Sequence, residues 1–312
     1  MTHDGTEQHR HPAPERPSHS PSRNSEGAGQ ATAGAHPKPR YIPALDGIRT
    51  LAVIAVVLYH LNVTWAQGGL QGVTVFFVLS GYLITHLMLV EHDGAGRIDL
   101  KDFWVRRLRR LMPAIVAVIV VTAALCTLFN HVMLTKMRGD ILPSLLFFNN
   151  WWQILRDASY FNALGDPSPL THFWSLAIEE QFYLIWPLAL VVAFRLDCRK
   201  RAVRRGVLVA AAASALAMSV LYDPAADPSR VYYGTDTRIF SLLLGAWLAF
   251  VPERARKRVD GAVPGGRGLD IVGLASLAGL CLIMVLTNGY TAFQYRGGTP
   301  VSYTHLRAHE TC

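Results

Sequence analysis

The chain has 312 residues, of which 51% are hydrophobic and 17% are charged, whereas about 25% of the residues in an ordinary soluble domain are charged. The formal net charge of +8 by itself fits nucleic acid, anionic lipid or an acidic substrate as a partner. The four cysteines lie far apart without a CxxC pair, which excludes a disulfide framework and a zinc finger. The composition predicts a membrane protein, and we expect no bound metal.

Residues 1–40 contain no Val, Ile, Leu, Phe, Trp or Tyr, but six prolines and five histidines. Such a segment cannot bury enough apolar surface to offset the entropy cost of ordering. It also lacks the apolar run of a signal peptide. We expect residues 1–40 to form a disordered tail; metal binding by its irregularly spaced histidines is the less favoured alternative.

Seven apolar runs follow, and a helix needs about 20 such residues to cross a bilayer. The runs are 44–65, 70–90, 113–129, 173–194, 207–222, 239–251 and 269–288. An eighth run, 141–155, holds Asn149, Asn150 and Gln153 beside two tryptophans, a mixture typical of the membrane interface. The pattern predicts an all-α polytopic transmembrane bundle of about seven spans. An extra pair of crossings is the competing topology.

Positive charge is concentrated between these runs. The breaks at 91–112, 195–206 and 252–268 hold 17 of the 30 Lys and Arg residues. The positive-inside rule places these breaks and the N-terminal tail in the cytoplasm. This topology accounts for most of the basic surplus, so no nucleic-acid partner is expected.

The last twelve residues, 301–312, show neither helical periodicity nor turn residues. Their sequence resembles translated sequencing adapter, so we expect an artificial ending, with an ordinary polar tail as the alternative. In that case residues 41–300 are a fragment of a longer transmembrane domain.

Ionisable residues inside spanning helices indicate function, because burying charge in hydrocarbon is costly. Arg49 and His60 are eleven residues apart, which puts them within about 20° on one helix face and about 16 Å apart along the axis. Asp46 lies one turn before Arg49 and is positioned to pair with it. The alternatives are interfacial capping by Asp46 and Arg49, and a structural role for a partly buried His60.

The run from His172, HFWSLAIEEQFYLIWP, contains adjacent Glu179 and Glu180. Helical spacing places His172, Glu179 and Tyr183 on one face, with Glu180 about 100° away. Either glutamate is a functional candidate, and anchoring between helices is the alternative.

Two further segments have simpler interpretations. Ser80 and Gly81 indicate close helix packing, and Asp236, Thr237 and Arg238 are explained by helix capping. Four arginines after the second run anchor the membrane face and also suit phosphate recognition. They are Arg106, Arg107, Arg109 and Arg110.

Five segments in order carry a family resemblance. They are ALDGIRTLAVIAVVLYH, GVTVFFVLSGYLIT, FWVRRLRRLMPA, HFWSLAIEEQFYLIWP and YGTDTRIFSLLLG. Together they resemble the membrane acyltransferase family 3, from residue 41 to about residue 288. The resemblance implies about ten spanning helices and transfer of acyl groups, commonly acetyl from acetyl-CoA, to hydroxyls of surface polysaccharides, lipid-linked sugars, peptidoglycan or secondary metabolites.

The resemblance also assigns residues. Arg49 and His60 correspond to the family's functional pair, Arg107 and Arg110 to its arginine motif, and the two glutamates to its EEQFY segment. Thr74 departs from the family, which often has an acidic residue there, and the final helices are missing.

Acyl transfer to a hydroxyl needs a base and a group that stabilises the oxyanion. We assign His60 as general base, Arg49 to orientation or donor phosphate, and Arg106, Arg107, Arg109 and Arg110 to cytoplasmic acyl-CoA. One of Glu179 and Glu180 would orient His60 or the acceptor. No permanently bound cofactor is expected; the partners are acyl-CoA, a saccharide, lipid-linked or small-molecule hydroxyl, and the bilayer of the cell membrane.

Three alternatives remain open. An acyl-histidine intermediate is less favoured than a general base. A transporter would use the same groups as a relay, although no inverted repeat is evident. A non-catalytic scaffold leaves the intramembrane charges unexplained.

Overall fold

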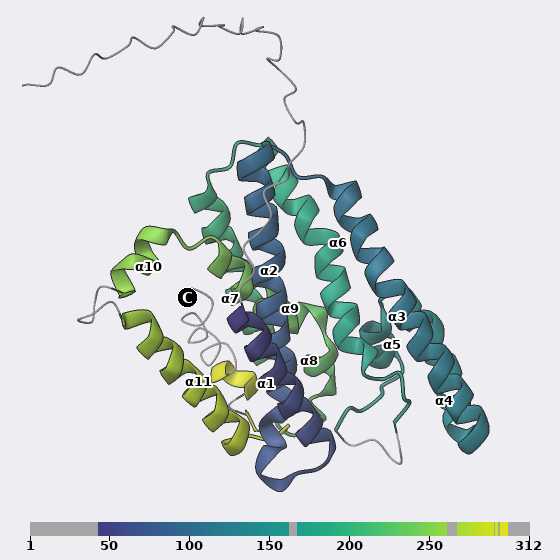
Figure 1. The fold of residues 1–312 in the computed structure, drawn as a ribbon. Coiled ribbons are helices and arrows are strands. Elements are labelled where there is room, and N and C mark those ends of the chain that lie inside the picture. The colour runs from purple at the N-terminus through teal and green to yellow at the C-terminus, as the bar shows by residue number, and fades with distance from the viewer. Residues whose placement is uncertain (1–42, 162–166, 261–266, 290, 293, 299–312) are drawn as a thin grey trace, which may run out of the picture. The chain divides into compact units, whose positions relative to one another are not determined.

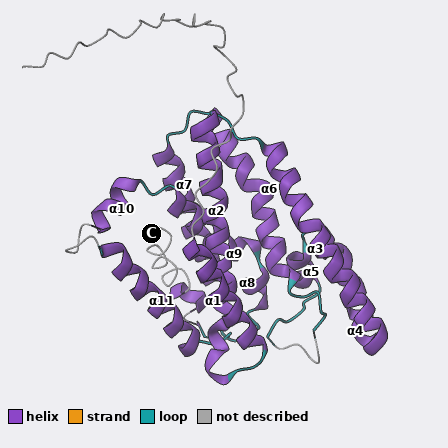
Figure 2. Ribbon diagram, viewed as in Figure 1, coloured by secondary structure: helices purple, strands orange, loops and turns teal. Residues whose placement is uncertain are grey.

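The protein is represented by a computed structural model that describes residues 43–161, 167–260, 267–289, 291–292 and 294–298 (Figure 1). The expected disordered tail and the suspected artificial ending, 301–312, lie outside the described residues. No strand occurs in the part of the chain that is described (Figure 2). The predicted all-α class is therefore confirmed.

The described part of the chain consists mainly of helices. They are α1 (Pro43–His60), η1 (Thr64–Gln71), α2 (Gly72–Ala95), α3 (Leu100–Phe129), α4 (His131–Leu145), α5 (Asn149–Leu155), α6 (Phe173–Arg195), α7 (Lys200–Leu221), α8 (Ser229–Tyr233), α9 (Thr235–Ala249), α10 (Glu253–Asp260), α11 (Gly268–Leu286) and η2 (Gln294–Gly298). All seven apolar runs predicted from the sequence are helical.

Four helical segments among the described residues are long and apolar enough to cross a membrane. They are Thr64–Ala95, Leu100–Phe129, Phe173–Arg195 and Lys200–Leu221. On α3 the large apolar side chains Val120, Val121 and Leu125 are exposed, as expected for a surface that contacts lipid tails. The chain is thus a helical membrane bundle.

Helix α3 begins thirteen residues earlier than the apolar run suggests and includes the arginine segment. The Asp99 side chain accepts a hydrogen bond from the Asp102 backbone N–H at 2.9 Å, which caps the start of the helix. The helix continues through Pro113. The arginines therefore lie on a helix that enters the bundle, and not on a separate loop.

The run at 141–155 is divided between two helices, because α4 ends at Leu145 and α5 begins at Asn149. Between them Phe147 adopts a φ of 57°. Asn149 and Asn150 are fully buried within the protein. The Asn150 amide donates to the Tyr233 carbonyl at 3.0 Å and accepts from Gln181 at 2.9 Å. Buried amides persist here because other helices supply their hydrogen-bond partners.

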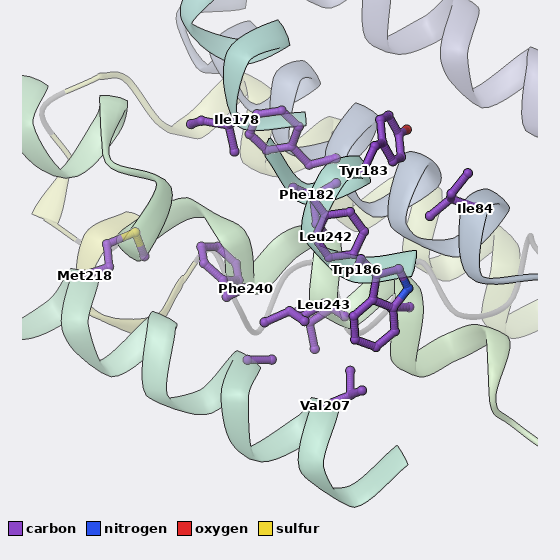
Figure 3. Close-up of a cluster of buried hydrophobic side chains, with 14 of the residues drawn as sticks. Ile84, Ile178, Phe182, Tyr183, Trp186, Val207, Met218, Phe240, Leu242 and Leu243 are labelled. Carbon is purple, nitrogen blue, oxygen red and sulfur yellow. The ribbon is translucent and has the colours of Figure 1, made fainter. Parts of the chain in front are cut away.

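The largest hydrophobic core lies among α2, α6, α7 and α9. Figure 3 shows Phe182 and Trp186 of α6 close to Leu242 and Leu243 of α9. The rings of Phe182 and Trp186 stack with their centroids 5.5 Å apart. The Trp186 indole N–H donates to the Thr85 hydroxyl of α2 at 2.8 Å, so this core also has a directional contact.

Helices α2 and α9 approach each other through two glycines. A Cβ added at Gly81 would overlap the backbone of Leu242, and one added at Gly245 would overlap the backbone of Val78. The prediction that Gly81 permits close helix packing is therefore confirmed. Small residues at such a contact let the backbones meet and gain dispersion energy.

We predict that Gly81→Val lowers the thermal unfolding midpoint of the detergent-purified protein, because overpacking a close contact costs about 1–3 kcal/mol. Gly206→Ala on α7 is the matched control, since a Cβ there meets nothing within 4 Å. Alanine at this position should leave the midpoint unchanged or raise it. Equal midpoints for Gly81→Val and the parent would show that α2 and α9 are not this close.

Candidate active site

Polar side chains gather in two places within the bundle. The first, the histidine cluster, consists of His60 at the end of α1, Tyr160, and His172 at the start of α6. The His60 and His172 rings lie 4.6 Å apart between centroids. The second, the arginine cluster, joins Arg107 of α3 to Glu179 and Glu180 of α6.

The hydrogen bonds of His60 define its tautomer. Its Nδ1 lies 2.7 Å from the Val56 carbonyl oxygen, and because a carbonyl only accepts, Nδ1 must carry the proton. In the neutral imidazole the other nitrogen, Nε2, then has the lone pair, and it lies 3.3 Å from the Tyr160 hydroxyl. His60 is exposed, contrary to the expectation of partial burial, because it is the last residue of α1. Its basic nitrogen faces away from its own helix.

The two neighbours of His60 are neutral at pH 7. Burial raises the pKa of the Tyr160 phenol far above its usual value, with nearby Tyr232 acting in the same direction, so the phenol remains a donor to Nε2. Desolvation lowers the pKa of His172 to about 4, and His60 contributes in the same direction. Both side chains beside His60 are therefore uncharged at neutral pH.

Arg49 pairs with Asp46 at 3.3 Å, as the sequence spacing predicts. The two side chains are only about half buried, with exposed fractions of 36% and 49%. Such partly exposed pairs contribute little stability, and Arg49 lies about 16 Å from His60 along the helix axis. The shared helix face of Arg49 and His60 is present, but the residues form no direct contact.

Arg107 forms a fork-shaped contact with Glu180. Its Nε and Nη2 donate to the Glu180 carboxylate at 2.9 and 2.6 Å, and its guanidinium lies 3.4 Å from the Tyr183 ring centroid. Glu179 accepts from Ser80 at 2.5 Å and from Tyr183 at 2.6 Å. With side chains only 22% and 9% exposed, Arg107 and Glu180 satisfy each other inside the bundle.

The hypothesis that a glutamate orients His60 is not supported by these contacts, since both carboxylates bind groups of the arginine cluster. Helix direction explains the difference. Glu179 lies seven residues beyond His172, which is about 10 Å along α6. The two clusters therefore occupy different levels of the same helix.

A cavity of about 530 Å³ adjoins the arginine cluster. Its lining on α2 extends from Glu91 to Ser80, and Tyr183 of α6 closes one side. Arg106, Arg107 and Arg110 of α3 line it as well. Arg109 is exposed and is not among the lining residues. Three of the four predicted cofactor-binding arginines thus share one cavity, although Arg106 also pairs with Asp102.

The prediction that Asp236 and Thr237 cap the start of α9 is wrong, because the N-cap residue is Gly234 and no side chain forms a capping hydrogen bond there. Asp236 does not cap the helix; it binds Arg230 through two hydrogen bonds of 3.1 and 2.9 Å. Thr237 donates to the Gly234 carbonyl at 3.0 Å. Arg238 is buried, and donates to Thr74 of α2 at 2.8 Å. The sequence signal for the burial of Arg238 was a charged residue at the start of an apolar run, which the capping interpretation left without a functional role.

Within the described ranges, no group of three or more His, Cys, Asp or Glu side chains is placed to hold a metal ion.

The apolar outer surface, buried ion pairs and positioned histidine define an integral membrane protein with reactive polar groups inside a helical bundle. A family model described as an acyltransferase domain matches residues 42–309. The chain belongs to this acyltransferase family, which confirms the resemblance carried by the five sequence segments. No solved structure matches the chain significantly.

Curated relatives are similar over most of this chain. It is 46% identical over 261 residues to the peptidoglycan O-acetyltransferase OatA of Listeria monocytogenes, covering 83% of this chain and 42% of the relative. It is 41% identical over 263 residues to the O-acetyltransferase OatA of Staphylococcus aureus, covering 83% and 43%. The chain thus spans about two-fifths of the length of these relatives.

We predict that Arg107→Met destabilises the protein by about 3–5 kcal/mol, because it leaves the Glu180 carboxylate buried without its cation. The double variant Arg107→Met/Glu180→Leu should recover most of this loss, since it removes both charges. Denaturant unfolding of the purified protein measures the difference. Arg106→Met, whose pair with Asp102 is exposed, should cost at most about 1 kcal/mol. A double variant no more stable than Arg107→Met would contradict this account.

Proposed function

We propose that this chain transfers an acyl group, in the first instance acetyl, from acyl-CoA to a hydroxyl group. The observation that carries the proposal is the tautomer of His60. The Val56 carbonyl fixes the proton on Nδ1, so the Nε2 lone pair is available to take a proton from a hydroxyl. Family membership supplies the reaction class.

The arginine cavity is proposed to receive the CoA moiety. Arg110 is exposed and lines the cavity, where its guanidinium can bind a phosphate through two parallel hydrogen bonds. Arg107 is already occupied by Glu180, so its role there is to shape the cavity. The positive-inside rule places this arginine-rich end of α3 in the cytoplasm, where acyl-CoA is available.

The transfer step balances without a cofactor. The acceptor hydroxyl replaces Tyr160 at His60 Nε2 and gives up its proton as its oxygen attacks the acyl carbonyl carbon. The carbonyl electron pair moves onto oxygen and returns as the carbon–sulfur bond breaks. The CoA thiolate leaves and takes the proton from Nε2, which restores neutral His60.

The acceptor is proposed to be a peptidoglycan hydroxyl, because the Listeria relative is named a peptidoglycan O-acetyltransferase. His60 is the last residue of α1, and the positive-inside rule favours an orientation in which this end faces away from the cytoplasm. An acceptor in the cell wall would approach the protein from that side.

We predict that His60→Ala and His60→Gln abolish transfer of radiolabelled acetyl from acetyl-CoA in membranes containing the full chain. Loss of a general base lowers the rate by about 100-fold or more. His131→Gln on α4 is the matched control, because His131 is exposed and remote from both clusters in sequence and contacts.

Label on an acceptor supports transfer, whereas substrate flux without loss of acetyl-CoA would indicate a transporter. Full transfer by either His60 variant, at normal membrane insertion, would remove His60 as the base.

We further predict that Arg110→Gln raises KM for acetyl-CoA about tenfold with little change in kcat, because a charge-assisted phosphate contact contributes uniform binding. Arg205→Gln is the control, since Arg205 is exposed on α7 and outside the cavity lining. Initial rates over a range of acetyl-CoA concentrations distinguish the two. Equal KM values for Arg110→Gln and the parent would exclude Arg110 from donor binding.

A further inference from the structure

Arg238 is the most deeply buried guanidinium of the described residues, with 2% of the residue exposed. One nitrogen, Nη2, donates to Thr74 at 2.8 Å, and the guanidinium lies 4.9 Å from the Tyr232 ring centroid. Its Nε has no hydrogen-bond partner, and no carboxylate among the described residues forms an ion pair with it. A hydroxyl and an aromatic face compensate only part of the desolvation cost of a cation.

This arrangement differs from that of Arg107 in the same bundle. Arg107 has a carboxylate fork from Glu180 and a second acid nearby. Arg238 retains a full positive charge and a free N–H donor in an apolar setting. Such a group binds strongly to any oxygen that becomes negative beside it, because neither water nor a fixed anion screens it.

Arg238 lies near the level of the histidine cluster. On α2 the cavity lining ends at Ser80, and Thr74 lies six residues earlier, which is about 9 Å nearer to the start of the helix. On α6, His172 lies about 10 Å before Glu179, which binds Ser80. An acyl group that moves from the cavity to His60 would therefore arrive at the level of Arg238.

Aromatic rings connect Arg238 to the histidine cluster. The Tyr232 ring beneath the guanidinium lies 4.7 Å from the Tyr160 ring, and the Tyr160 hydroxyl reaches His60. The Tyr233 hydroxyl is also buried without a hydrogen-bond partner, and its ring lies 5.8 Å from that of Tyr160. Unpaired donors thus lie beside the residue that contacts the base.

We propose that Arg238 is a further catalytic residue, whose guanidinium binds the acyl carbonyl oxygen and stabilises the negative charge that develops there during transfer. The proposal rests on the acyl transfer proposed above. His60 takes the acceptor proton, the carbonyl electron pair moves onto the oxygen held by Arg238, and the pair returns as the CoA thiolate leaves. Arg238 itself neither gains nor loses a proton, since arginine stays charged.

The decisive variant is Arg238→Met, which removes the charge and keeps much of the side-chain volume. Loss of one oxyanion donor lowers kcat by about 100-fold or more, and KM for acetyl-CoA should change by less than about threefold. The thermal unfolding midpoint should not fall, because an apolar isostere of a buried charge is commonly neutral or stabilising. Arg238→Lys keeps the charge without the fork and should lose kcat by about tenfold.

The matched control is Arg230→Met, because Arg230 is close in sequence but is partly exposed and paired with Asp236. It should keep the parental kcat. All variants are compared in membranes containing the full chain, at equal inserted amounts, by release of CoA from acetyl-CoA and by unfolding after purification.

Each outcome decides the proposal. A low kcat with an unchanged or higher midpoint in Arg238→Met supports it. A parental kcat in Arg238→Met overturns it; where that variant fails to insert, a parental kcat in Arg238→Lys does so. A loss of kcat that only accompanies a lower unfolding midpoint also overturns it. If the parent protein releases no CoA, the proposed function fails and this inference with it; if the parent is active and Arg238→Met is too, only this inference fails.

Discussion

The close approach of α2 and α9 is the constraint on which the remaining structure depends. Gly81 and Gly245 have no side chains that would separate the two backbones. Polar groups on the two helices can therefore contact each other, which a wider spacing would prevent. The hydrogen bond from Arg238 to Thr74 crosses this contact. In a membrane, where lipid tails are as apolar as leucine, such van der Waals contact and interhelical hydrogen bonds replace the hydrophobic effect as the force between helices. The glycines thus determine both the stability of the bundle and which polar groups it brings together.

The bundle contains two buried arginines whose charges are compensated differently. Arg107 is neutralised by Glu180, and the neighbouring Glu179 is satisfied by Ser80 and Tyr183. This cluster links α2, α3 and α6, and its charges are largely neutralised within the cluster. Arg238 is compensated by a hydroxyl and a ring alone. A buried ion pair is costly to break, but its neutralised charges interact little with a reacting group. A buried unpaired cation lowers stability, but it can interact with a charge that appears only during the reaction.

The sequence predicted much of the fold, because apolar length and charge distribution are local properties. All seven apolar runs became helices, and the pairing of Arg49 with Asp46 followed from helical spacing. It could not predict which helices would meet. Asn149 and Asn150 lie in a run with the composition of a membrane interface, but their hydrogen-bond partners come from distant segments: Leu170 for Asn149, and Gln181 and Tyr233 for Asn150. The two glutamates stood out in the sequence as charges within an apolar run, but the binding of Glu180 to Arg107 depends on a contact between residues 73 positions apart. Arg238 was assigned to capping because its burial is created by α2.

The separation of the two clusters has a chemical consequence for a membrane acyltransferase. In the transfer proposed above, a charged donor and a polar acceptor approach from opposite sides of the bilayer and cannot meet in hydrocarbon, so the protein would have to bring the reacting carbon between them. The order along α6, from His172 to Trp174 to Glu179, places an aromatic layer between the base and the cavity, where Trp174 packs 4.7 Å from Tyr232. Aromatic rings add apolar surface there but offer no charge to an oxyanion. In the proposed transfer, the buried Arg238 guanidinium, which has no carboxylate partner among the described residues, would supply that charge.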